Sequence, residues 1–269
     1  AFWNWWPELY NDLHTFRITG GEPLLSKDTF KVLDYIIDTK KPNKNLALSI
    51  NSNLGVNDTL INKFIKKAEV ICEEDRVKEL VVYTSIEATE EQAEYTRHGL
   101  DHKRFWSNVE KILTKLPKVN IVIMSTFNAL SVFTYEKLIE KVFDIKKKYS
   151  SNNRYKPSAI SLDTSYLRWP SHLSVKILKE EHIELILKAA KKALYLGMKE
   201  YSSDNFGFTN MEIQKIKRIY DYAKGKSIMF DIEKHRKDFI NFVNQYDKRR
   251  GTNFLKTFPE LKEFYAEYK

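Results

Sequence analysis

The chain has 269 residues, of which 42% are hydrophobic and 13% aromatic, which is enough apolar material for a sizeable core. Nowhere does it hold the run of about eighteen apolar residues that a transmembrane helix needs, and its first residues lack the features of a signal peptide. Its single cysteine, Cys72, excludes an internal disulfide framework and any metal site with several thiolate ligands from this chain. We therefore expect a cytoplasmic protein that does not span a membrane.

The composition is basic, with 45 Lys and Arg against 36 Asp and Glu, a formal net charge of +9 and a pI of about 9.2. A basic surface suits nucleic acid or an acidic substrate. Much of the excess, however, lies in helical segments such as "IKKKY" and "KAAKKAL". Those lysines are interpreted as solvated helix faces rather than as a binding patch.

Apolar, strand-like runs alternate with segments of helical periodicity through the first 200 residues. Ser26 and Asn57 precede the first two helical segments as N-cap residues. Strand, helix and strand in succession, with short connections, predict right-handed βαβ units around a parallel sheet or barrel. Strands are expected at 14–19, 46–50, 79–86, 120–126 and 159–164, and helices at 27–40, about 57–70, 103–116, 134–149 and 179–196.

The pattern changes at about residue 200. A polar, glycine-containing connection, "YSSDNFGFTN", leads into a predicted helix at 210–224 and then into a charged, aromatic tail. We expect a main domain over 1–200 and a small, mostly helical extension over 201–269. That extension is either an appended region or the start of a second domain.

Small polar side chains follow every predicted strand. In parallel β/α folds, ligands bind at the carboxyl ends of the strands. At any one position, turn formation and helix capping are the favoured explanation of such residues, but five consecutive strand ends favour a polar small-molecule site. The residues are Thr19-Gly20-Gly21-Glu22, then Ser49, Asn51, Ser52 and Asn53, then Ser85 and Glu87, then Ser125, Thr126 and Asn128, and finally Asp163, Thr164 and Ser165.

These segments carry a family likeness. "FRITGGEPLLSKDTFKVLDYI" resembles the second β/α unit of radical S-adenosylmethionine (SAM) enzymes, including their GGEP motif. "LSINSNL", "VVYTSIEATEEQAEYTRHGL" and "VNIVIMSTFNAL" resemble the three units that follow, in the same order. The likeness covers roughly residues 14–200. The tail resembles, more weakly, the auxiliary-cluster domain of twitch-type members.

The resemblance implies an α/β fold, a partial (β/α)6 TIM-like barrel that is incomplete at its N-terminus. It implies SAM bound across the strand ends, with a [4Fe-4S] cluster that cleaves SAM reductively to a 5'-deoxyadenosyl radical, which abstracts a substrate hydrogen atom. Such an enzyme needs a reducing electron donor. A peptide, a small metabolite and RNA all stay open as its substrate.

The resemblance also implies roles for individual residues. The turn of Gly20, Gly21, Glu22 and Pro23 would accept hydrogen bonds from the ammonium group of SAM. The carboxylate of SAM would bind Ser85 and Arg97. Asn51 or Asn53 would face the ribose. The residues near ribose and adenine would be Ser125, Thr126 and Asn128.

Each of these residues also has a purely structural interpretation. Glu22 would cap the helix that begins near Ser26. Arg97 would form a surface ion pair with Glu94 or Asp101. The segment Asn53-Leu54-Gly55 would be a plain turn.

One departure from the family is large. The cluster is normally held by three cysteines in a CxxxCxxC loop before GGEP, and this chain has none there. A lone thiol cannot hold a cubane cluster, so Cys72 is expected to be an ordinary half-buried residue and no metal ligand is assigned. We favour a fragment of a longer enzyme, inactive by itself, over a cluster-less relative that serves as a basic α/β binding module for a ligand or nucleic acid.

Overall fold

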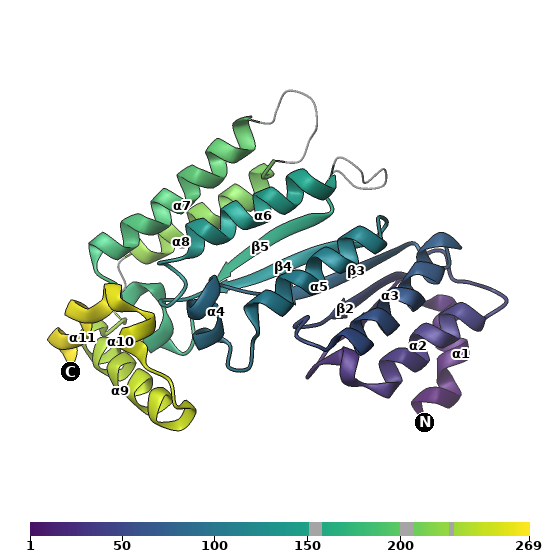
Figure 1. Ribbon diagram of the computed structural model, residues 1–269, viewed down its shortest axis with the longest axis horizontal. Helices are drawn as coiled ribbons and strands as arrows, with labels where there is room; N and C mark the ends of the chain where they lie inside the picture. The colour runs from purple at the N-terminus through teal and green to yellow at the C-terminus, as the bar shows by residue number, and fades with distance from the viewer. Residues whose placement is uncertain (151–157, 200–206, 226–228) are drawn as a thin grey trace. The chain divides into compact units, whose positions relative to one another are not determined.

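The computed structural model describes residues 1–150, 158–199, 207–225 and 229–269. Its five strands form one parallel sheet in which spatial order follows chain order (Figure 1). Ile18 of the first strand pairs with Ile50 of the second, and Ile50 pairs with Val82 of the third. All five predicted strands are confirmed: β1 (Thr15–Ile18), β2 (Ala47–Asn51), β3 (Glu79–Ser85), β4 (Asn120–Phe127) and β5 (Ile160–Tyr166).

The helices predicted from periodicity are confirmed as well. They are α2 (Lys27–Asp38), α3 (Asp58–Glu73), α5 (His102–Lys115), α6 (Tyr135–Ser150), α7 (Glu180–Lys199) and α8 (Asn210–Lys224). None of the described helices combines the length and the apolar character that crossing a bilayer requires. The helices that sequence periodicity did not predict are α1 (Phe2–Asp12), α4 (Glu90–Thr96), α9 (Ile232–Arg250), α10 (Phe254–Thr257) and α11 (Lys262–Tyr268).

Both predicted N-caps are present. The Ser26 hydroxyl accepts a hydrogen bond from the Asp28 amide at 3.2 Å. The Asn57 side chain accepts one from the Leu60 amide at 3.1 Å. Each cap satisfies an amide that the first turn of its helix leaves without a partner, and typically contributes about 1 kcal/mol.

The chain divides into two compact units. Unit 1 comprises Ala1–Ser85, Lys103–Ile123 and Ile145–Ser161, and unit 2 comprises Ile86–His102, Met124–Asp144 and Leu162–Lys269. The domain boundary expected at residue 200 falls beside residues 200–206, which lie outside the described part of the chain. It stays a prediction.

In unit 1, helices α2 and α3 pack against each other and bury apolar side chains over the first strands (Figure 1). Helix α1 adds an aromatic cluster around the fully buried Trp6. The Trp6 ring lies 4.8 Å from the Phe16 ring and 6.0 Å from that of Tyr35. Burying an aromatic side chain of this kind stabilises a fold by about 2–3 kcal/mol, so α1 is an integral part of unit 1.

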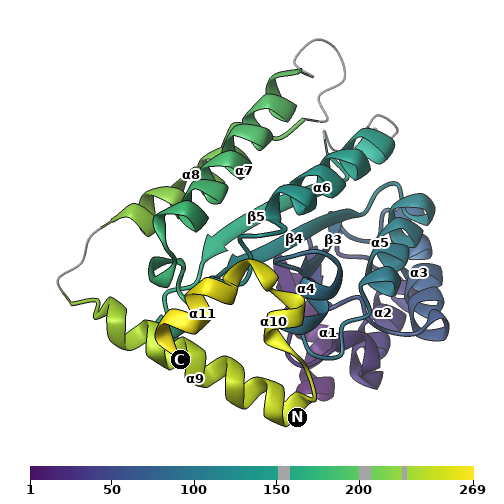
Figure 2. The ribbon, with the colours of Figure 1, turned by 60° about the vertical axis from the view of Figure 1, so that its left-hand side comes forward.

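In unit 2, α7 packs along α8, and the C-terminal helices α10 and α11 fold back onto α9 (Figure 2). Tyr95 of α4 donates a hydrogen bond to the Asp247 carboxylate of α9 at 3.0 Å. A cluster of buried phenylalanines fills the space between the C-terminal helices. Its members are Phe239, Phe254, Phe258 and Phe264.

The stability of unit 2 should fall as the solution becomes acidic, because His182 is buried beside Phe133. Burial lowers the pKa of His182, an effect that Glu181 and Glu260 oppose and that Lys179 and Arg236 reinforce. The unfolded state therefore takes up the proton first, and stability is lost as pH falls from about 6.5 towards the lowered folded-state pKa. For each unit by which the folded state lowers the pKa of His182, the free energy of unfolding falls by about 1.4 kcal/mol once the pH is below both pKa values.

Urea unfolding between about pH 8 and pH 5 checks this expectation. The His182→Gln variant, which does not titrate, should show a smaller loss of stability with acid than the wild type does. The half-buried His172 and His102 have pKa values lowered by partial burial too, and they should retain the remaining slope in that variant. An unchanged pH slope would contradict the assignment to His182.

Candidate functional site

The GGEP segment folds as an open turn directly after β1. Gly20 and Gly21 have φ angles of +90° and +43°, in the left-handed region where a side chain would be strained. No heavy atom lies within 4 Å of a Cβ built on either glycine. Their backbone is therefore open to close approach by a ligand. Pro23 then begins a short 3₁₀ helix, η1 (Pro23–Leu25).

The Glu22 carboxylate ties this turn to the end of the neighbouring strand. Its Oε1 accepts hydrogen bonds from the Leu24 amide at 3.0 Å and the Ser52 hydroxyl at 2.7 Å, and its Oε2 accepts one from the Asn53 amide at 2.7 Å. A carboxylate has about four acceptor positions, so one is left. Glu22 was expected to cap the helix that begins near Ser26, but Ser26 itself caps that helix, α2. Glu22 is instead the N-cap of the preceding 3₁₀ helix, η1.

Both candidate ribose-binding amides take part in contacts within unit 1. Asn51 Oδ1 accepts a hydrogen bond from Arg17 Nε at 2.9 Å. Asn53 Oδ1 accepts one from the Gly55 amide at 2.7 Å, which makes the turn that was the structural interpretation of this segment. The side-chain amide group of Asn53 is exposed and retains its donors for a ligand.

Asn108 of α5 holds the same loop from inside the fold. It is completely buried, and its Nδ2 donates hydrogen bonds to the carbonyl oxygens of Leu54 at 2.8 Å and Val56 at 3.0 Å. Leu54 has a φ of +52°, a conformation that is costly for a side chain with a Cβ. Glu22 and Asn108 together fix the loop after β2 in this conformation.

A cavity of 840 Å³ opens beside the GGEP turn, within unit 1. Phe2 and Trp3 of α1 line it together with Phe16 and Arg17 of β1. The turn itself and the start of α2 complete the wall. Its size and its mixture of aromatic and polar groups are typical of small-molecule sites.

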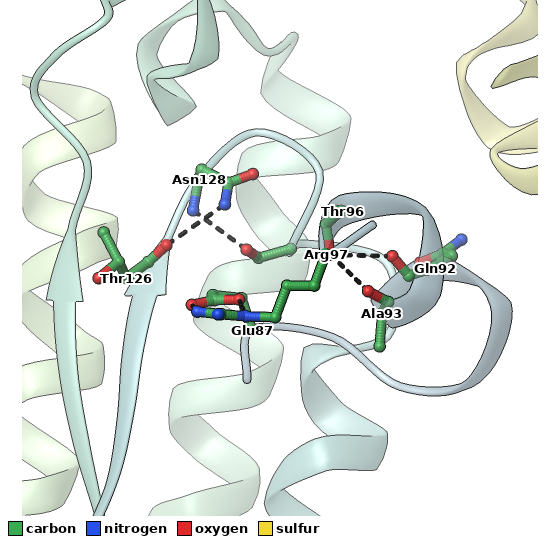
Figure 3. A network of polar contacts seen from close by, with 8 residues as sticks. Glu87, Gln92, Ala93, Thr96, Arg97, Thr126 and Asn128 are labelled. Carbon is green, nitrogen blue, oxygen red and sulfur yellow. Dashed lines mark hydrogen bonds and ion pairs between the residues drawn. The ribbon is translucent and has the colours of Figure 1, made fainter. Parts of the chain in front are cut away.

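In unit 2, Arg97 forms a two-point contact with Glu87 (Figure 3). Nε of Arg97 donates to Oε2 of Glu87 at 2.6 Å, and Nη2 donates to Oε1. The Glu87 side chain is 6% exposed and that of Arg97 is 34% exposed. The arginine that was expected to bind the carboxylate of SAM thus holds a carboxylate of its own chain, and the partner is Glu87 rather than Glu94 or Asp101.

The end of α4 positions this arginine. The Thr96 hydroxyl donates to the carbonyl oxygens of Gln92 and Ala93, both at 3.0 Å, and closes the last turn (Figure 3). The Arg97 amide donates to the Ala93 carbonyl at 3.0 Å. Two of the five N–H donors of Arg97 contact Glu87, which leaves three for a ligand.

The remaining predicted residues lie at strand ends or, for Ser125, inside the last part of a strand. Asn128 follows β4 and folds its loop through Oδ1, which accepts a hydrogen bond from the Leu130 amide at 2.9 Å. Its Nδ2 donates to the Thr126 carbonyl at 3.3 Å (Figure 3). Ser125 is buried within β4. Ser85 is the half-buried last residue of β3.

Buried hydroxyls lie next to Ser125 in unit 2. The Tyr135 hydroxyl is 2.7 Å from the Thr164 hydroxyl of β5. Burial raises the pKa of Tyr135, while the Ser125 and Thr164 hydroxyls oppose that shift. Tyr135 is therefore a neutral hydroxyl at physiological pH, which suits it to packing rather than to proton transfer.

The predicted site residues are divided between the two units. Gly20, Gly21, Glu22, Pro23, Asn51, Asn53 and Ser85 belong to unit 1, and Arg97, Ser125 and Asn128 belong to unit 2. Within unit 1 the structure brings Glu22 to the backbone of Asn53. Sequence reasoning noted Ser52 and Glu87 at strand ends without giving them a role, and Asn108 carried no signal because it lies in an ordinary amphipathic helix.

The residues of this chain do not fit an iron–sulfur cluster. Cys72 is its one cysteine and is buried in α3, more deeply than the half-buried position expected. Among the described residues, no group of three or more His, Cys, Asp or Glu side chains is placed to hold a metal ion. A cubane cluster needs several thiolates, so no cluster chemistry is assigned to these residues.

Comparison with protein-family models, with curated proteins and with solved structures gives no match to this chain.

Proposed function

We propose that this chain is the SAM-binding part of a radical SAM enzyme whose cluster cysteines lie outside the 269 residues. The observation that carries the proposal is the GGEP turn, which follows β1 with both glycines open and with Glu22 tied to the end of β2. In this proposal the sheet, whose strands follow each other in chain order, is part of a cytoplasmic (β/α)6-type barrel.

The turn suits an ammonium group. An ammonium has three donors and no acceptor, and so it binds where carbonyl oxygens and a carboxylate meet. The backbone of Gly20 and Gly21 can be approached closely, and Glu22 has one acceptor position left. The negative charge of Glu22 adds an attraction that a neutral loop lacks.

Within unit 2, Arg97 has the chemistry that the carboxylate group of an amino-acid ligand requires. Its three remaining N–H donors are held in place by the two-point contact with Glu87. Because the guanidinium is partly exposed, it reaches a ligand while its partner stays buried. The pairing with Glu87 therefore holds the guanidinium of Arg97 in place and leaves three of its N–H groups able to donate to a ligand.

Calorimetric titration with S-adenosylhomocysteine, the stable analogue of SAM, tests the proposal. Saturable binding should weaken at least about tenfold in both Glu22→Ala and Arg97→Ala, since each change removes a charged hydrogen-bonding partner. Glu8→Ala, an exposed position on α1, is the matched control and should bind like the wild type. Equal affinity in all four proteins would overturn the assignment.

The single cysteine favours a second candidate, a binding module that has the same fold but no redox chemistry. The coding sequence on either side of these 269 codons separates the two. An in-frame CxxxCxxC before GGEP supports the radical enzyme, with a peptide, small metabolite or RNA as substrate. Its absence supports the binding module.

A further inference from the structure

The positive charge of this protein is concentrated in two short segments of unit 1. Residues 103–123 hold five Lys or Arg and one Glu, and residues 145–161 hold five Lys or Arg and no acidic residue. Together they carry a charge equal to the formal +9 of the whole chain. In the rest of the chain the numbers of basic and acidic residues are equal. Arg154 and Lys156 lie outside the described residues.

Folding brings these two segments together, although about twenty residues separate them in the chain. Lys148 of α6 pairs with Glu110 of α5 at 2.6 Å. The Tyr149 hydroxyl donates to the same carboxylate at 3.2 Å and lies 3.1 Å from the Thr114 hydroxyl. These contacts fix the C-terminal end of α6 against α5.

A groove of 460 Å³ lies between the two segments. Glu110, which also lines it, has its carboxylate engaged by Lys148 and Tyr149. The other groups facing the groove are ammonium groups and hydroxyls, which donate hydrogen bonds to anions. They belong to Lys111, Lys115, Lys148, Ser107, Thr114 and Tyr149.

We call Lys103, Lys111, Lys115, Lys147 and Lys148 the α5–α6 basic surface. Lys111 pairs with Asp58, and Lys148 pairs with Glu110. Lys103, Lys115 and Lys147 are exposed and have no ion pair within the described part of the chain. Cations in the last turn of a helix offset its dipole, which accounts for Lys115, Lys147 and Lys148 but leaves Lys103 and Lys111 unexplained.

The composition of this surface selects the class of partner. No large hydrophobic side chain is exposed along the described parts of the two segments, whereas protein interfaces have an apolar centre and membrane-binding helices have an apolar face. Lysines and hydroxyls without apolar anchors are typical of contacts with phosphate. We infer that the α5–α6 basic surface binds the phosphodiester backbone of a nucleic acid, independently of base sequence.

Fluorescence anisotropy with a labelled oligonucleotide of about 20 nucleotides, as RNA and as DNA of the same sequence, tests this inference. The triple variant Lys103→Glu, Lys115→Glu and Lys147→Glu should lose about 100-fold in affinity at about 100 mM salt. Its slope of log K against log salt should be smaller by about 2, because three phosphate contacts are lost. Tighter binding of one oligonucleotide identifies the natural form of the partner.

The control changes charge by the same amount on exposed lysines of unit 2, Lys191→Glu, Lys256→Glu and Lys262→Glu. It should bind within about threefold of the wild type, because these lysines do not belong to the α5–α6 basic surface. If the triple variant fails to fold, Lys115→Gln with Lys147→Gln replaces it, with a smaller loss expected. Equal losses in test and control, no binding by the wild type, or equal affinity for polyglutamate would overturn the inference.

Discussion

Replacing Glu22 by alanine should lower the free energy of unfolding by about 3 kcal/mol. Three donors contact this half-buried carboxylate at 2.7–3.0 Å. Each hydrogen bond to a charged group contributes about 1.5 kcal/mol when shielded from water, and partial exposure reduces the sum to about 3 kcal/mol. Two of those donors belong to the buried Leu24 and Ser52, and alanine leaves them without a partner. Urea unfolding followed by tryptophan fluorescence measures the change.

Two further variants sharpen this expectation. Glu22→Gln keeps the size of the side chain but replaces one carboxylate oxygen with an NH₂ group, which cannot accept a hydrogen bond from the donor opposite it. This variant should therefore lose about half as much stability as Glu22→Ala. Glu8→Ala, at an exposed position, should change stability by less than about 0.5 kcal/mol. A Glu22→Ala protein as stable as Glu8→Ala would show that the carboxylate does not hold the turn.

Replacing Arg97 by alanine should cost unit 2 about 3 kcal/mol. The change leaves the Glu87 carboxylate, whose side chain is only 6% exposed, without its cation. Breaking a buried pair costs about 3–5 kcal/mol, and the partial exposure of Arg97 places the expected value at the low end. Urea unfolding again provides the measurement.

The pair also predicts a pattern of rescue. Arg97→Lys keeps the charge but loses the two-point geometry, so its loss should be smaller, at about 1 kcal/mol. Adding Glu87→Gln to Arg97→Ala removes the unpaired charge and should restore part of the lost stability. Additive losses in the double variant would mean that the two side chains act independently.

Hydrophobic periodicity was sufficient for the sheet because strands of a parallel sheet are continuous apolar runs. All five strands and every predicted helix are present. Helix α1 escaped prediction because it is a run of aromatic residues interrupted by Pro7, and α4 because seven residues give too little periodicity to detect.

The candidate site was predictable only where a local motif marks it. Gly20, Gly21 and Glu22 are visible as a motif, whereas the partner of Arg97 depends on how α4 turns the chain between Glu87 and Arg97. Asn108 lies more than 50 residues from the carbonyl groups that it binds. The lysines of "IKKKY" look like a solvated helix face until α5 is placed beside them.

If the GGEP turn binds the amino-acid part of SAM, an NMR titration will detect the ligand at the backbone amides of the turn. The amides of Gly20, Gly21, Glu22 and Asn53 should shift with SAM and with S-adenosylhomocysteine. They should not shift with 5'-methylthioadenosine, which lacks the ammonium and carboxylate groups. Unmoved amides with all three ligands, or equal shifts with 5'-methylthioadenosine, would contradict the claim.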